Sequence, residues 1–228
     1  MTIPDIASAA QFGLPDSPVA VAARQLAYDV SPEFVYNHAV RSYVFARELS
    51  TADGMPDVGD DELLFLTCVL HDLGATEYAN TDQRFEMDGA DAAARFLDEH
   101  GVDAARVETA WTAIALHTSV GLAHRFGALA ALAQMGIGTD IVGTYKPLLP
   151  QGFADRVHSA WPRDDLGYGL AAVVAEQAQR NPAKAPPMSF PAHFHQLMYH
   201  VDSPTTWFDV VDAAGWNDLP VAVRDGVS

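Results

Sequence analysis

The chain has 228 residues and a formal net charge of −17, because 30 aspartates and glutamates outnumber 13 lysines and arginines. Proteins that bind nucleic acid or anionic membranes need clustered positive charge, so this balance argues against both kinds of partner. It also disfavours polyanionic substrates, and a small neutral or cationic molecule fits best. Hydrophobic residues make up 49% of the chain, which is enough for a buried core in one folded domain.

The chain shows no signal for export or membrane insertion. Its first residues contain neither a basic segment nor a long apolar run. No window approaches the roughly 20 apolar residues of a membrane span. The only cysteine, Cys68, lies in an apolar run, and we interpret it as a buried small residue that forms no intrachain disulfide. We therefore expect a cytoplasmic protein.

Helix signals begin after residues 1–16, which we interpret as a loose N-terminal arm. Ser17-Pro18 and Ser31-Pro32 each place a capping serine before a proline, a combination that begins many helices. Capping residues, apolar periodicity and terminal glycines then predict successive helices. The expected helices cover residues 17–28, 32–49, 62–72, 85–100, 104–117, 126–140, 163–180, 189–201 and 205–214.

Two further expectations concern the second half of the chain. Gly136 and Gly138 are expected to bring the helix over 126–140 to its end. Residues 144–163 contain several prolines and glycines and are expected to form a connection.

Strand signals are nearly absent, because β-branched residues do not alternate with polar ones over any length. The sequence therefore predicts an all-α helical bundle. We assign residues 17–228 to a single domain, with its motifs within 31–143 and additional C-terminal helices within 163–214. No P-loop or glycine-rich nucleotide fingerprint occurs.

The adjacent residues His71 and Asp72 end the most apolar helix. An ionised aspartate buried there costs several kcal/mol unless a cation or hydrogen bonds compensate for the charge. Taken alone, the pair is better explained by a histidine near the helix dipole beside a solvated aspartate. His38, on an apolar helix stripe, and Asp140, at the end of an apolar helix, change this interpretation. Two imidazoles and two carboxylates form a ligand set suited to zinc, iron or manganese, and helices of a bundle can bring such residues together.

The order of these residues resembles the HD-domain superfamily. Within that superfamily, five ordered segments are similar to the cyanamide hydratases: YNHAVRSYVFA, LTCVLHDLGAT, RFEMDGADAAARFL, AIALHTSVG and GIGTDIVG. They fall within residues 31–143, about half of the chain, and the C-terminal third matches less well. A bare His-Asp dipeptide is common, so the resemblance depends on the five segments together.

The resemblance implies an HD-domain helical bundle with a metal site. By that resemblance His38, His71, Asp72 and Asp140 hold one divalent ion, for which we expect zinc and keep iron and manganese as alternatives. Members of the superfamily are mostly phosphohydrolases, with some hydratases and some di-iron oxygenases.

Three residues are candidates for catalysis: His117, Thr118 and Asp72. His117 follows an apolar helix stripe, and the unperturbed pKa of a histidine, about 6.5, suits proton transfer at neutral pH. The alternative is a core histidine followed by a helix-end threonine.

Four residues are candidates for contacts with the substrate or with the metal ligands. They are Asn37, Arg41, Glu86 and His124. Asn37 and Arg41 are equally well explained as a surface pair, and Glu86 as an exposed residue of a first helical turn. His124 would be a ligand only if the site held two metals, and we favour one. We interpret His193, His195 and His200 as lining or capping residues whose role is open.

Two activities compete. In the first, a metal-dependent hydratase adds water to a small nitrile-type substrate such as cyanamide, giving urea. In the second, a phosphohydrolase uses the same ligands and needs Arg41, Arg84 or Arg125 to bind phosphate. A di-iron oxygenase needs more ligands than we can place, and a non-enzymatic signalling module would not need all four. We expect a small-molecule substrate and leave the oligomeric state open, a homo-oligomer included.

Overall fold

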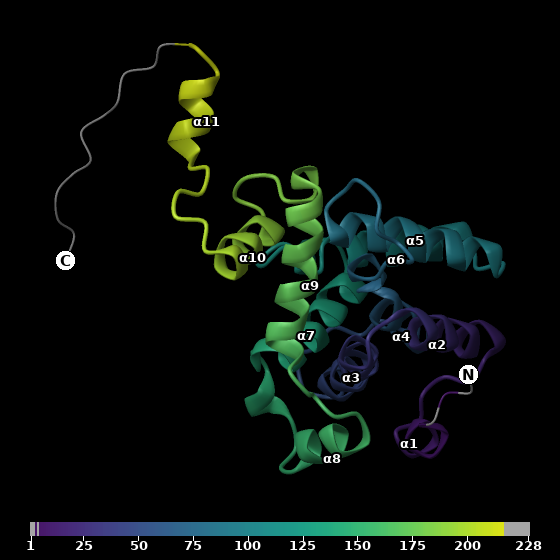
Figure 1. Ribbon diagram of the computed structural model, residues 1–228. Helices are drawn as coiled ribbons and strands as arrows, with labels where there is room; N and C mark the ends of the chain where they lie inside the picture. The colour runs from purple at the N-terminus through teal and green to yellow at the C-terminus, as the bar shows by residue number, and fades with distance from the viewer. Residues whose placement is uncertain (1–2, 4, 217–228) are drawn as a thin grey trace.

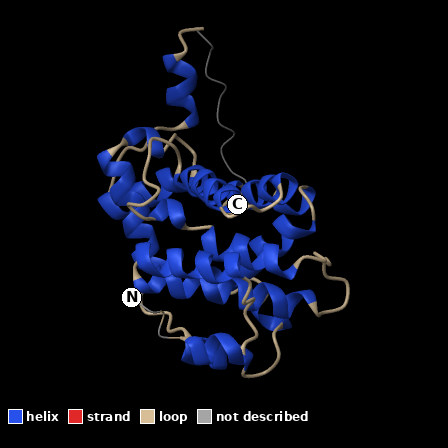
Figure 2. Cartoon of the chain, turned by 90° about the vertical axis from the view of Figure 1, so that its right-hand side faces the viewer, coloured by secondary structure: helices blue, strands red, loops and turns tan. Residues whose placement is uncertain are grey.

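The computed structural model describes residue 3 and residues 5–216. Throughout these residues the regular elements are helices and no strand occurs (Figure 2), which confirms the predicted all-α bundle. The α-helices are α1 (Ile6–Gln11), α2 (Pro18–Val30), α3 (Glu33–Ser50), α4 (Asp61–Leu70), α5 (Phe85–Glu99), α6 (Ala104–Ala115), α7 (Ala128–Val142), α8 (Phe153–Ala160), α9 (Leu166–Arg180), α10 (Phe190–Tyr199) and α11 (Trp207–Ala213). Short 3₁₀ helices are η1 (Leu73–Ala75), η2 (Ala123–Arg125), η3 (Lys146–Leu148) and η4 (Pro182–Lys184).

Helix α3 lies inside the bundle. It packs against α4 and α7 and also contacts α2, α8 and α9 (Figure 1). A helix covered on most sides must bury residues all round its axis, and α3 buries every residue from Val35 to Ala46. Its sequence therefore also places polar residues in the interior, among them His38 and Arg41, which are both 0% exposed.

Helix α7 approaches α3 closely through a glycine. A Cβ atom at Gly136 would lie 2.2 Å from the carbonyl oxygen of Ser42 and 2.6 Å from the Cβ of Ala46, so only glycine fits there. The expectation that Gly136 and Gly138 end the helix is wrong, because Gly136 serves packing inside it. The helix continues to Val142 and ends at Gly143, whose φ of 73° is left-handed.

The expected connection over 144–163 contains helix α8, which the prolines and glycines around it concealed. Phe153 and Val157 are one helical turn apart, and Val157 is fully buried. The ring of Phe153 contacts those of Phe12 and Phe45, with centroids 6.4 and 6.3 Å apart. The N-terminal arm is likewise partly ordered: it forms α1, and Phe12 after α1 packs against Trp161.

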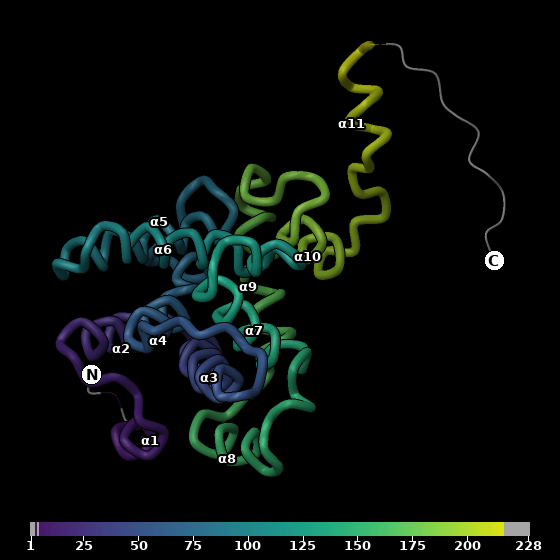
Figure 3. Tube along the Cα trace, turned by 180° about the vertical axis from the view of Figure 1, so that it is seen from behind, coloured from purple at the N-terminus to yellow at the C-terminus, as the bar shows by residue number. Residues whose placement is uncertain are grey.

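Helices α10 and α11 complete the C-terminal part of the described chain. Helix α10 packs against α9, whereas α11 stands away from the bundle in both views (Figures 1 and 3). The hydroxyl of Thr206 and the carboxylate of Asp209 cap the start of α11 reciprocally. Among the described residues, no helix combines the length and apolar character that a membrane crossing requires.

Candidate metal centre

The pair His71 and Asp72 lies in the turn between α4 and η1. All side chains of α4 from Leu63 to Leu70 are buried, so the residues that directly follow this helix lie in the interior. Gly74 allows α5 to pack closely on this turn, because a Cβ there would lie 1.8 Å from the carbonyl oxygen of Phe85. The start of α5 therefore packs directly on the turn. The side chain of Gln177 also donates a hydrogen bond to the Gly74 carbonyl, at 2.9 Å.

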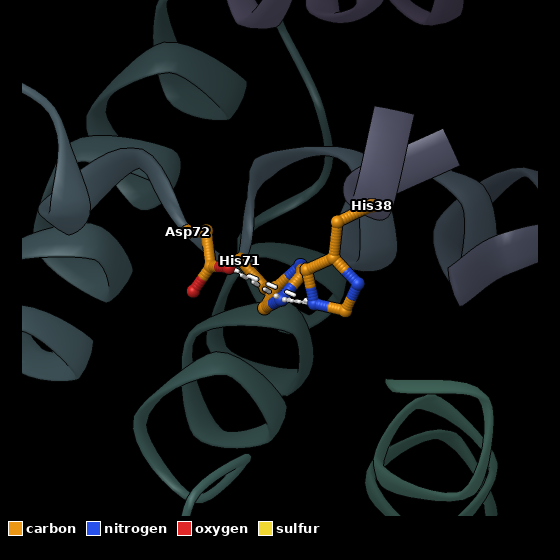
Figure 4. Close-up of side chains that lie close together, drawn as sticks. All are labelled: His38, His71 and Asp72. Atoms are coloured by element: carbon orange, nitrogen blue, oxygen red, sulfur yellow. Dashed lines mark hydrogen bonds and ion pairs between the residues drawn. The ribbon is translucent and has the colours of Figure 1, made fainter. Parts of the chain in front are cut away.

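His38, His71 and Asp72 form a buried group that can hold a metal ion. One ligand atom from each lies within 4.8 Å of the others, as the close-up shows (Figure 4). The Nε2 atoms of His38 and His71 are 3.2 Å apart. Asp72 Oδ2 lies 3.2 Å from His71 Nε2 and 3.7 Å from His38 Nε2. All three residues are at most 3% exposed.

Hydrogen bonds on Nδ1 orient the imidazoles around this group. His71 Nδ1 lies 2.7 Å from the carbonyl oxygen of Cys68, and His38 Nδ1 lies 2.7 Å from a carboxylate oxygen of Asp140. His117 repeats the arrangement, with Nδ1 2.6 Å from the carbonyl oxygen of Ile114. Because these oxygens only accept, Nδ1 carries the proton in each ring, and the neutral ring keeps a lone pair on Nε2.

This pattern leaves a surplus of electron pairs around Asp72. The Nε2 atoms of His38 and His71 face its carboxylate, and His117 Nε2 lies 3.6 Å from Oδ1. Both oxygens of Asp72 are buried without a hydrogen-bond partner. A buried carboxylate beside imidazole lone pairs is expensive until a cation neutralises it. Nitrogen and oxygen donors of this kind bind transition metals, so the residues fit a divalent metal ion.

The pKa values of the metal-free group also indicate a site that favours a cation. Burial lowers the pKa of His38 below its usual value. Burial and the neighbouring His71 lower the pKa of His117 to about 4. Burial alone would lower the pKa of His71, but the charge of Asp72 outweighs it and raises this pKa. The pKa of Asp72 is lowered, although burial opposes the shift, because His71 is close. Without a metal, His71 therefore takes up the proton that a cation would displace.

Asp140, the fourth expected ligand, lies on the opposite side of the His38 ring. Its carboxylate accepts hydrogen bonds from Arg41 Nε at 2.9 Å and Nη2 at 2.8 Å, and Arg163 Nη1 lies at 3.0 Å. The structure thus brings three of the four expected ligands together and places Asp140 where it orients His38. Burial alone would raise the pKa of Asp140, but His158, His38 and Arg41 hold it well below its usual value.

The neighbours of Asp140 include residues that the sequence did not reveal. Arg163 and His158 approach it from the segment around α8, which the sequence did not predict as a helix. Gln134 was also missed: its amide lies 3.0–3.4 Å from the carbonyl oxygens of Leu116, His117 and Ser119. It therefore holds the turn that follows α6. No local pattern marks these residues, because each contact joins distant parts of the chain.

Several of the other residues that the sequence suggested for the site are partly or fully buried and hydrogen-bonded. Thr118 Oγ1 donates a hydrogen bond of 2.9 Å to Glu86, which is 1% exposed and also pairs with Arg84. The exposed position considered for Glu86 is therefore wrong. Asn37 and Arg41 are buried and hydrogen-bond to the carbonyl of Pro162, so they are not a surface pair either.

A cavity of about 420 Å³ opens onto the group. Its inner end contains His38, His71 and Asp72, and its lining also includes His117, Thr118 and His124. Exposed residues such as Val120 and Val142 mark its mouth. His193, His195 and His200 are not part of this lining.

The described residues that line the cavity include no lysine or arginine. Arg41 is committed to Asp140 and to backbone carbonyls. Arg84 pairs with Glu86, and Arg125 lies on η2 outside the lining. None of the three arginines considered for phosphate binding therefore faces the cavity.

Neither the protein-family models nor the curated proteins compared with the chain give a match.

Proposed function

We propose that the chain is a metal-dependent hydratase of the HD-domain type, related to the cyanamide hydratases, which adds water to a nitrile-type substrate. One observation carries the proposal: a buried group of His38, His71 and Asp72 lies at the inner end of a cavity whose described lining has no lysine or arginine. The five sequence segments around these residues support the same family. We propose zinc as the metal, with iron and manganese as the alternatives to test.

The chemistry divides between the metal and the chain. When bound, a divalent metal supplies a water of lowered pKa and polarises the nitrile. The chain holds that ion with His38, His71 and Asp72. His117 carries its proton on Nδ1, which lies 2.6 Å from the carbonyl oxygen of Ile114, so the lone pair on its Nε2 can accept a proton from the water. Thr118, fixed by its hydrogen bond to Glu86, orients the substrate from the same turn.

Phosphoester hydrolysis is less well supported. Its transition state carries charge on the phosphoryl oxygens, which cationic side chains normally stabilise. Arg41, Arg84 and Arg125 do not face the cavity, as described above. A neutral substrate such as cyanamide needs no such partner, which favours hydration.

A direct assay separates the two activities. Protein loaded with zinc, iron or manganese is expected to release urea from cyanamide and no phosphate from p-nitrophenyl phosphate. A chelator is expected to abolish urea release, and the matching metal to restore it. Phosphate release without urea release would contradict the proposal and favour the phosphohydrolase.

Replacing His117 with alanine is expected to lower kcat by about 10²–10⁴-fold, the usual effect of a positioned acid or base, while the metal content stays unchanged. Elemental analysis, kcat and the melting temperature check this on one variant. Metal loss together with activity would show that His117 is a ligand. A loss of about 1–3 kcal/mol of stability with unchanged kcat would show a packing role. The matched control is His100→Ala, because His100 Nδ1 also bonds a backbone carbonyl, at 2.8 Å, but lies outside the cavity lining.

A further inference from the structure

The cavity is far larger than cyanamide requires. Its volume of about 420 Å³ falls within the range of about 300–1,000 Å³ that is usual for sites that bind drug-sized molecules. Cyanamide, with its few atoms, would occupy only the inner end beside Asp72. The outer space needs a different explanation.

The wall of that outer space is apolar and firmly packed. Phe85, Leu170, Ile141 and Phe194 line the cavity and also belong to, or pack against, the smaller hydrophobic core between α5, α7, α9 and α10. Met135 and Ile137 extend the apolar lining along α7. An apolar wall that is part of a core holds its shape. Binding of an apolar group there is favourable, because the group displaces water from the apolar surface.

Most polar groups of the lining lie away from this apolar wall. The carboxylate and three of the four imidazoles are gathered at the buried end, and Thr118 is bound to Glu86. The fourth imidazole, that of His124, and the hydroxyl of Thr144 belong to exposed residues, and Tyr145 is half-buried. The amide of Gln134 is directed to backbone carbonyls. The cavity therefore has a polar inner end and an apolar chamber in front of it.

We propose that the chamber binds the apolar body of the substrate, an aliphatic chain or a ring, while the reacting group lies beside Asp72. The proposal rests on the hydratase function for the identity of that group, a nitrile. The oxygen of water bonds to the nitrile carbon, one π bond of the C≡N group opens, and both protons of water finish on nitrogen after tautomerisation. The product is a carboxamide, and no oxidant or reductant is needed.

Binding along a chain-length series tests the chamber. The Kd values of acetonitrile, butyronitrile and hexanenitrile, measured by calorimetry on the metal-loaded protein, are expected to fall by about fourfold for each added methylene. A Kd that does not change with chain length would overturn the proposal, even if cyanamide is hydrated. Conversely, a falling Kd without any amide product would support the chamber and count against the hydratase.

Two glycines allow the chamber to be filled without disturbing the fold. A Cβ at Gly138, on α7, would meet only the Thr144 hydroxyl at 3.7 Å, and one at Gly167, on α9, would meet nothing within 4 Å. Both glycines line the cavity. Gly138→Leu and Gly167→Leu should fold, since neither glycine has a left-handed φ.

The Gly138→Leu variant is expected to bind hexanenitrile about tenfold more weakly, because its side chain occupies space that the alkyl chain needs. Gly167→Leu is the second variant, should the first have a lowered melting temperature. The control is Ala105→Leu, which places the same leucine side chain at an exposed position of α6 and is expected to leave the Kd unchanged. Wild-type affinity for hexanenitrile in both folded glycine variants would overturn the proposal.

Discussion

The Asp72→Ala variant is expected to lose hydration activity to below detection and to retain almost no metal. Asp72 is the only carboxylate of the buried group, and its oxygens have no hydrogen-bond partner. It therefore supplies the negative charge that draws a cation to the site. Without it, two neutral imidazoles hold the ion weakly, and metal affinity and stability fall together.

Three measurements check this expectation. Elemental analysis gives the metal content, the urea assay gives kcat, and melting with and without a chelator gives the stabilisation due to the ion. The wild-type melting temperature is expected to drop on chelation, and that of the variant is expected not to respond. The control is Asp98→Ala, which removes the same charge from an exposed position on α5. Full metal content in Asp72→Ala would show that Asp72 is not a ligand.

Removing the carboxylate of Asp140 is expected to destabilise the protein by about 3–5 kcal/mol, because the Arg41 guanidinium would remain buried without its partner. Arg41 is 0% exposed, and its Nε and Nη2 both donate to Asp140. Chemical denaturation of Asp140→Ala at neutral pH measures the loss. The double variant Arg41→Met/Asp140→Leu is expected to be more stable than Asp140→Ala, because it leaves no fully buried guanidinium without its carboxylate partner. Equal or lower stability of the double variant would contradict this account of the pair.

The effect of Asp140 also has a predictable pH dependence. Its pKa is lowered by folding, and such a carboxyl stabilises the protein above its unfolded pKa of about 3.9. That stabilisation is lost as the pH falls through the lower pKa of the folded state. The difference between wild type and Asp140→Ala is therefore expected to stay constant from about pH 5 to 8 and to shrink in stronger acid.

The same variant separates the two roles of Asp140. If it only orients His38, metal affinity is expected to fall by about 10–100-fold. If it is a direct ligand, as the order of the motif implies, metal loss should match that of Asp72→Ala. A competitive chelator titration of both variants distinguishes the outcomes.

Helices were the most predictable feature of this chain, because apolar periodicity and capping residues act over a few neighbouring positions. The Ser17-Pro18 signal, for example, begins α2 as expected, with the Ser17 hydroxyl accepting from the backbone NH of Ala20. Helix α8 escaped prediction because it is short and proline and glycine surround it. The extension of α7 past Gly136 could not be foreseen, since the reason is contact with α3, 94 positions earlier at Ser42.

The site was predictable in its residue types and less so in its geometry. The sequence indicated that His38, His71 and Asp72 belong together, and the structure brings them into one group. The sequence could not show whether Asp140 lies beside Nε2 of His38, as a metal ligand would, or beside Nδ1, where it orients the ring. An aspartate can serve either role. The apolar chamber was also not predicted, because its wall is assembled from α5, α7, α9 and α10.

The contact at Gly74 has a consequence for how mutations in this chain should be interpreted. The carbonyl of Phe85 and the amide nitrogen of Gly89 occupy the volume that any side chain at position 74 would need. Every substitution there must push α5 away from the turn that carries His71 and Asp72. Position 74 therefore tolerates a single residue type although it supplies no reactive atom. Invariance of this glycine among relatives would report on the fit of two backbones, and a catalytic role should not be assigned to it on that basis.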